Sequence, residues 1–115
     1  MALKKYLPRP LKVVHCGSTN KAREAFEYWR LQDTLDNMIV MTVGAKVSDA
    51  ELHLSIEKKQ ELDLLHLSKI EEADLVRILN VEGYIGERTQ RELEYAQRLG
   101  KMILFLEPLN NEPRI

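Results

Sequence analysis

The chain has 115 residues, the size of one ordinary domain, and its 44% hydrophobic content is enough to form a core. Seventeen Lys and Arg residues against 18 Asp and Glu residues leave a net charge of −1, which argues against a binder of nucleic-acid polymers because phosphate backbones require a basic surplus. The single cysteine excludes an internal disulfide and is typical of a cytoplasmic protein. No apolar run approaches the roughly 20 residues of a membrane span, so no membrane association is expected.

The sequence predicts one domain over residues 11–108, between an N-terminal arm (1–10) and a loose tail (109–115). Strands are predicted at 12–16, 38–43, 75–79 and 102–106. Helices are predicted at 21–36, at 56–72 with Ser55 as the cap, and at 89–99 with Gly100 as the stop. The continuous apolar run 38–43 predicts a strand covered on both faces. The middle helix is expected to bury Leu62, Leu65 and Ile70.

The order β-α-β-α-β-α-β predicts an α/β fold: an open parallel sheet with helices on both faces, in three layers. Ligands of such sheets bind at the carboxyl ends of the strands. Three predicted loops meet there, at residues 17–20, 44–54 and 81–89.

The first of these loops, residues 16–19, follows a strand and opens a helix. Its backbone N–H groups can hold a phosphate or a ribose hydroxyl. An ordinary turn capped by Ser18 or Thr19 explains the same residues.

The last of these loops leads into a helix that carries a carboxylate. Glu92, Ala96 and Leu99 lie at i, i+4 and i+7, so Glu92 tops an apolar stripe close to the strand ends. This position suits a reactive group. The alternative is a capping box, because Thr89 and Glu92 spell T-x-x-E.

Histidine and arginine supply further candidates. His66 can act as an acid, a base or a hydrogen-bond donor, or it can be a partly buried helix residue. His15, His53 and His66 show no zinc-ligand spacing, so neither a metal nor another cofactor is expected. Arg77 interrupts an apolar strand, which predicts an edge position or a buried ion pair.

Three motifs together resemble the nucleoside 2-deoxyribosyltransferase superfamily, which includes the 2′-deoxynucleoside 5′-monophosphate N-glycosidases. They are Cys16-Gly17-Ser18, Ala73-Asp74 before an apolar strand, and Glu92-Leu93-x-Tyr95-Ala96 before Gly100-Lys101. The resemblance covers residues 13–108, and residues 62–108 look most similar to a small branch of that superfamily.

The resemblance implies a flavodoxin-like or Rossmann-like sheet, a homodimer or higher homo-oligomer, and a nucleoside or nucleotide as the ligand. It makes Glu92 the nucleophile that attacks C1′ of the sugar, and water or a second base then resolves the glycosyl ester with net retention. It implies that substrate contacts come from Gly17, Ser18, Thr19, Tyr84, Gly86, Arg88 and Thr89.

Two positions depart from the active members of this superfamily. His66 stands where they carry an aspartate, although an imidazole can protonate a departing base. Gly86 stands where the monophosphate glycosidases carry a phosphate-binding serine, and Arg88 is close enough in sequence to bind an anion instead. The sequence therefore leaves three functions open: an enzyme acting on N-glycosidic bonds, a catalytically silent nucleotide-binding module, and a scaffold for assembly.

Overall fold

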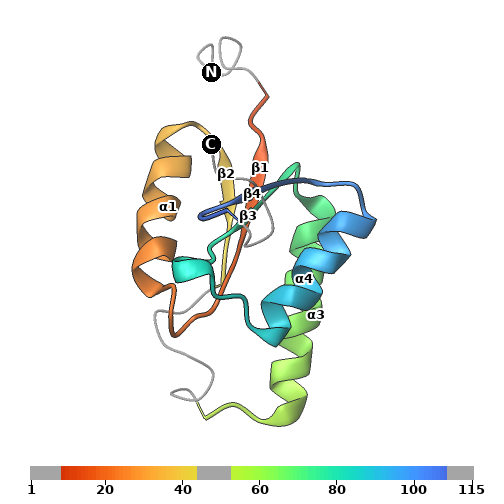
Figure 1. Cartoon of the computed structure of the whole chain (residues 1–115). Helices are drawn as coiled ribbons and strands as arrows, with labels where there is room; N and C mark the ends of the chain where they lie inside the picture. Colours follow the sequence, from red (N-terminus) through yellow and green to blue (C-terminus); the bar gives the residue numbers. More distant parts are fainter. Residues whose placement is uncertain (1–8, 44–52, 109–115) are drawn as a thin grey trace.

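The structure, a computed structural model, describes residues 9–43 and 53–108 (Figure 1). Strands and helices alternate along this part of the chain. The strands are β1 (Lys12–Cys16), β2 (Ile39–Met41), β3 (Leu75–Ile78) and β4 (Met102–Phe105). The helices are α1 (Arg23–Leu35), α3 (Ile56–Glu72), α4 (Glu87–Arg98) and the short 3-10 helix η2 (Val81–Gly83).

The strands form one parallel sheet in the order β2-β1-β3-β4. Helix α1 covers one face, and α3 and α4 lie side by side on the other (Figure 1). The predicted three-layer α/β fold is therefore confirmed, and its strand order is that of a flavodoxin-like sheet. Such a sheet has a switch point between β1 and β3, because the chain leaves these neighbouring strands toward opposite faces.

The core has two parts, one on each side of the sheet. On the side of α3 and α4, alternate residues of β1 and β3 pack against residues of both helices. This cluster consists of Val14, Cys16, Ile70, Ala73, Val76, Ile78, Leu93 and Ala96. On the side of α1, Ala22 and Phe26 pack against Leu79.

A buried polar group joins α1 to the two central strands. The Asp33 carboxylate, fully buried on α1, lies 2.7 Å from His15 Nε2 on β1. It also accepts hydrogen bonds of 2.9 and 2.8 Å from the guanidinium of Arg77 on β3. The same guanidinium stacks on Trp29, 4.1 Å from the ring centroid. Arg77 is therefore in the buried ion pair that was one of its two predicted roles, and the edge position is wrong because β3 pairs on both sides.

Two predictions about burial are wrong. Strand β2 is shorter than residues 38–43 and lies at an edge, where Ile39 is 46% exposed, so it is not covered on both faces. Leu62 and Leu65 are 40% and 51% exposed, and the buried positions of α3 are His66 and Ile70. The first half of α3 extends past the carboxyl ends of the strands in Figure 1, so the sheet does not cover this part of the helix.

The predicted arm (1–10), the loop 44–54 and the tail 109–115 lie wholly or mostly outside the described residues. Among residues 9–43 and 53–108, no helix is long and apolar enough to cross a membrane.

Candidate functional site

The candidate site lies at the carboxyl ends of β1 and β3, where the switch point of the sheet is found. Cys16 is the last residue of β1, and η2 and the start of α4 follow β3. Asn80 fixes the end of β3 by exchanging hydrogen bonds of 2.8 and 2.9 Å with the main chain of Glu107, just beyond β4. These two hydrogen bonds hold the start of the loop between β3 and α4 in place.

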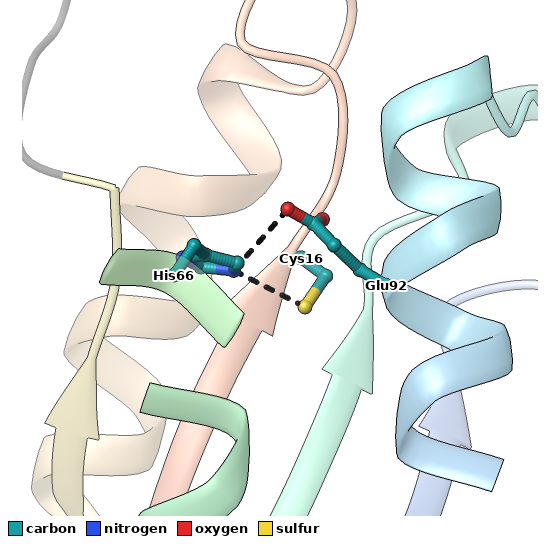
Figure 2. Close-up of side chains that lie close together, drawn as sticks. All are labelled: Cys16, His66 and Glu92. Carbon is teal, nitrogen blue, oxygen red and sulfur yellow. Dashed lines mark hydrogen bonds and ion pairs between the residues drawn. The ribbon is translucent and has the colours of Figure 1, made fainter. Parts of the chain in front are cut away.

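Three buried side chains meet at this edge of the sheet: Cys16 from β1, His66 from α3 and Glu92 from α4 (Figure 2). Cys16 Sγ lies 3.3 Å from His66 Nε2, and Glu92 Oε2 lies 3.9 Å from the same nitrogen. The structure thus brings together both residues predicted to be catalytic and adds the cysteine between them.

The surroundings of His66 determine its protonation. Burial, followed by the charges of Lys69 and Arg88, lowers the pKa of His66 to about 4, so the ring is neutral near pH 7. A hydrogen bond with the His15 backbone favours the protonated ring, so the ring donates it and the main-chain carbonyl accepts. Nε2 lies 3.3 Å from Cys16 Sγ and 3.9 Å from Glu92 Oε2, so this nitrogen faces both side chains.

Glu92 does not belong to a capping box. Helix α4 begins at Glu87, its N-cap is Gly86, and no side chain caps it. Thr89 is therefore inside the first turn rather than at the cap, and the capping-box interpretation is wrong. Burial raises the pKa of Glu92 to about 7, although the nearby charge of Arg88 lowers it. The carboxylate is consequently a buried group without a helix-capping role.

Two cavities flank this part of α4, and Arg88 borders both. The larger, of about 310 Å³, is lined by Asp63, Leu67, Arg88, Arg91, Glu92, Glu94, Tyr95 and Arg98. The smaller, of about 200 Å³, is lined by Ser18, Tyr84, Gly86, Glu87, Arg88 and Thr89. Five of the seven predicted substrate-binding residues thus surround the smaller cavity, and the predicted nucleophile borders the larger one.

The loop after β1 has a structural role as well. The Ser18 hydroxyl accepts a 3.2 Å hydrogen bond from the Lys21 amide, as the turn interpretation predicts, and Ser18 also lines the smaller cavity. Gly17 allows close packing, because a Cβ atom there would lie 3.2 Å from both Cβ and the carbonyl oxygen of Leu79. Gly17 and Thr19 line neither of the two cavities.

Several site residues were missed by the sequence interpretation. Asp63 and His66 are three positions apart in a helix, so their shared face could have been predicted once His66 was singled out. Asp63 also lies 3.7 Å from the Arg88 guanidinium across the gap between α3 and α4. The place of Cys16 beside His66 depends on packing between elements 50 residues apart, which leaves no local signal.

Donor atoms of Cys16, His66 and Glu92 lie within 4.8 Å of one another, so this trio can hold a metal ion. The expectation of no metal came from sequence spacing alone, which cannot detect ligands from three separate elements.

Neither a comparison with protein-family models nor a search among curated proteins gave a match. The chemistry of the site residues and the cavities beside them are therefore the basis for a function.

Proposed function

We propose that the chain cleaves or exchanges the N-glycosidic bond of a nucleoside or nucleotide through a covalent glycosyl ester on Glu92. The observation that carries this proposal is the position of Glu92, whose carboxylate borders the larger cavity without capping α4. The resemblance to the nucleoside 2-deoxyribosyltransferase superfamily supports the same residue as nucleophile.

The chemistry requires one carboxylate and two displacements. A carboxylate oxygen of Glu92 attacks C1′, the C1′–N bond breaks, and its electron pair leaves with the base, which takes a proton from water. The oxygen of a water molecule then attacks C1′ of the ester, releasing the carboxylate and a proton to solvent. If a nitrogen of a second base attacks instead, the sugar is transferred. Two inversions give net retention at C1′.

The smaller cavity suits an anionic end of the substrate. Gly86 caps α4 without a side-chain hydrogen bond, and a helix N-terminus attracts negative charge. The Ser18 hydroxyl and the Arg88 guanidinium border the same space. This arrangement favours a phosphorylated sugar, with its phosphate near the start of α4 and C1′ at Glu92.

A second candidate, the catalytically silent nucleotide-binding module, is favoured by His66. The neutral ring occupies the position at which active members of the resembled superfamily carry an aspartate, and at pH 7 it holds no extra proton for a leaving base. We therefore assign His66 a positioning role in the enzyme. Asp63, one helical turn earlier, borders the cavity of Glu92 and is a further carboxylate available to the chemistry.

The test is release of free base from a panel of deoxynucleosides and their 5′-monophosphates, followed by chromatography. We expect release by the unmodified protein and a loss of roughly 1,000-fold or more in Glu92→Gln, because removal of a nucleophile abolishes the covalent route. Glu72→Gln is the matched control, since this exposed carboxylate lies at the far end of α3.

Calorimetric titration with the same compounds separates the two candidates. Binding without base release, in both the unmodified protein and Glu92→Gln, supports the silent module. Equal base release by Glu92→Gln and the unmodified protein contradicts a nucleophilic Glu92. Absence of both binding and release rejects both candidates.

A further inference from the structure

The three buried side chains at the end of β1 form a donor set for a metal ion. Thiol sulfur, imidazole nitrogen and carboxylate oxygen are the ligand types that zinc prefers in proteins. Cys16, His66 and Glu92 supply one of each, and their side chains point toward one another (Figure 2). All three residues are at most 6% exposed.

The distances suit a four-coordinate ion. Metal–sulfur and metal–nitrogen bonds of about 2.3 and 2.0 Å at a tetrahedral angle hold neighbouring donors about 3.5 Å apart. The sulfur–nitrogen distance of 3.3 Å is close to this value. The nitrogen–oxygen distance of 3.9 Å is longer than the roughly 3.3 Å that two bonds of about 2.0 Å set, so binding of an ion draws the Glu92 carboxylate toward the other two donors.

His66 presents Nε2 to the cluster, 3.3 Å from Cys16 Sγ, and its ring also has a hydrogen bond with the His15 backbone. Hydrogen bonds of this kind orient the rings of metal-binding histidines. The His15 backbone lies on a central strand, and the His15 side chain is held by Asp33 at 2.7 Å, so this partner is fixed as well.

The charges balance. A thiolate, a carboxylate and a neutral imidazole carry two negative charges, which a divalent ion neutralises, and a neutral set is much less costly to bury than an isolated charge. Burial raises the pKa of the Cys16 thiol in the metal-free protein, so binding of an ion displaces the thiol proton. Of the three residues, Glu92 also borders the larger cavity, so the cluster lies next to that space.

We propose that Cys16, His66 and Glu92 bind a zinc-class divalent ion, and that this ion and a glycoside substrate compete for the Glu92 carboxylate. The ion site stands on the cluster alone, whereas the competition rests on the proposed function. The competition follows because coordination holds the carboxylate at the ion and draws electron density from it, which weakens Glu92 as a nucleophile toward C1′.

The test is titration of the chelator-treated full chain with Co²⁺, a spectroscopic substitute for Zn²⁺. We expect saturation at one equivalent, visible bands of a four-coordinate ion, and a near-ultraviolet thiolate-to-cobalt charge-transfer band that Zn²⁺ abolishes. Cys16 is the only cysteine of the chain, so this band has one origin. A folded, unmodified protein that gives no such band overturns the ion site.

Variants assign the remaining ligands. Cys16→Ser should lose the charge-transfer band, and His66→Ala and Glu92→Gln should each weaken Co²⁺ binding at least tenfold. His53→Ala is the matched control, because this histidine is exposed and lies before α3. Circular dichroism establishes that each variant is folded. If one of them fails to fold, the titration of the unmodified protein still decides the claim. Unchanged affinity in both folded His66→Ala and folded Glu92→Gln would also overturn it.

Base-release kinetics test the competition. Zn²⁺ should raise the apparent KM for the glycoside and leave kcat unchanged, as a competitor does. An unchanged KM in the presence of saturating Zn²⁺ contradicts the competition. Cobalt binding without base release from any substrate leaves the ion site in place and rejects the proposed function. Base release without a cobalt band supports the proposed function and rejects the ion site.

Discussion

Glu92 shows how a candidate reactive residue acts on stability. Burial raises the pKa of its carboxyl group from 4.5 to about 7, so the folded chain holds a proton that the unfolded chain releases between these pH values. The contribution of this group to stability is complete below pH 4.5 and is lost as the pH rises toward 7. The groups that face the carboxylate are Arg88 and Arg91 on α4, Asp63 and His66 on α3, and Cys16 on β1.

We predict that Glu92→Gln is more stable than the unmodified protein at pH 7 by roughly 2–3 kcal/mol, because the amide carries no charge to bury. The difference should shrink toward zero as the pH falls to 4.5. Urea unfolding of both proteins across this range, with a chelator present, measures it. A stability difference that does not change with pH would show that the carboxyl group is not perturbed by burial.

His66 makes this comparison between variants necessary. Its pKa is lowered from 6.5 to about 4, so its contribution to stability is lost as the pH falls through this window. The contributions of His66 and Glu92 therefore oppose each other over most of the same range. The unmodified protein alone would show little net slope from these two groups, and only the difference between the proteins isolates Glu92.

At the scale of elements, the start of α4 excludes a capping role for Glu92. The motif T-x-x-E is typical of a capping box, and sequence alone could not decide between a cap and a reactive group. In the structure, Gly86 is the N-cap, so Thr89 is the third residue of the helix and Glu92 the sixth. The helix thus begins three residues earlier than a capping box would require, and Glu92 lies in the second turn, where it borders a cavity.

Asp33 ties three elements together, since it lies on α1 and binds His15 on β1 and Arg77 on β3. We predict that Asp33→Ala costs about 3–5 kcal/mol of unfolding free energy, because it leaves the buried Arg77 charge without its partner. Asp36→Ala, at an exposed position just after the same helix, should change stability far less. Urea unfolding tests both, and equal effects of the two substitutions would mean that the buried pair contributes nothing.

At the scale of the whole molecule, alternation of strands and helices was enough to predict the layers and the parallel sheet, and it directed attention to the edge where the candidate site lies. The predictions of burial were wrong at positions where burial depends on how much of the sheet lies against the residue. Leu62 and Ile39 are apolar and fit their expected elements, but α3 extends past the strands and β2 lies at an edge. The contact between Cys16 and His66 could not be predicted from the sequence pattern, because it forms only when β1 and α3 pack together.

The expected homo-oligomer stays a prediction of the resemblance. Met102 and Leu104 on the edge strand β4 are 65% and 43% exposed, which leaves apolar surface uncovered in the isolated chain. Sedimentation of the full chain measures the oligomeric state directly, and a monomer at all concentrations would contradict that expectation.

The most direct test of a nucleophilic Glu92 is mass spectrometry of the protein after incubation with a 2-deoxy-2-fluoro nucleoside or its 5′-monophosphate. Fluorine at C2 disfavours an oxocarbenium-like transition state, so a glycosyl ester, once formed, is hydrolysed slowly enough to be detected. We predict that the intact mass rises by one fluorosugar unit, that peptide mapping places the unit on Glu92, and that Glu92→Gln takes up none. Base release without an ester, or an ester on another carboxylate, would contradict a nucleophilic Glu92.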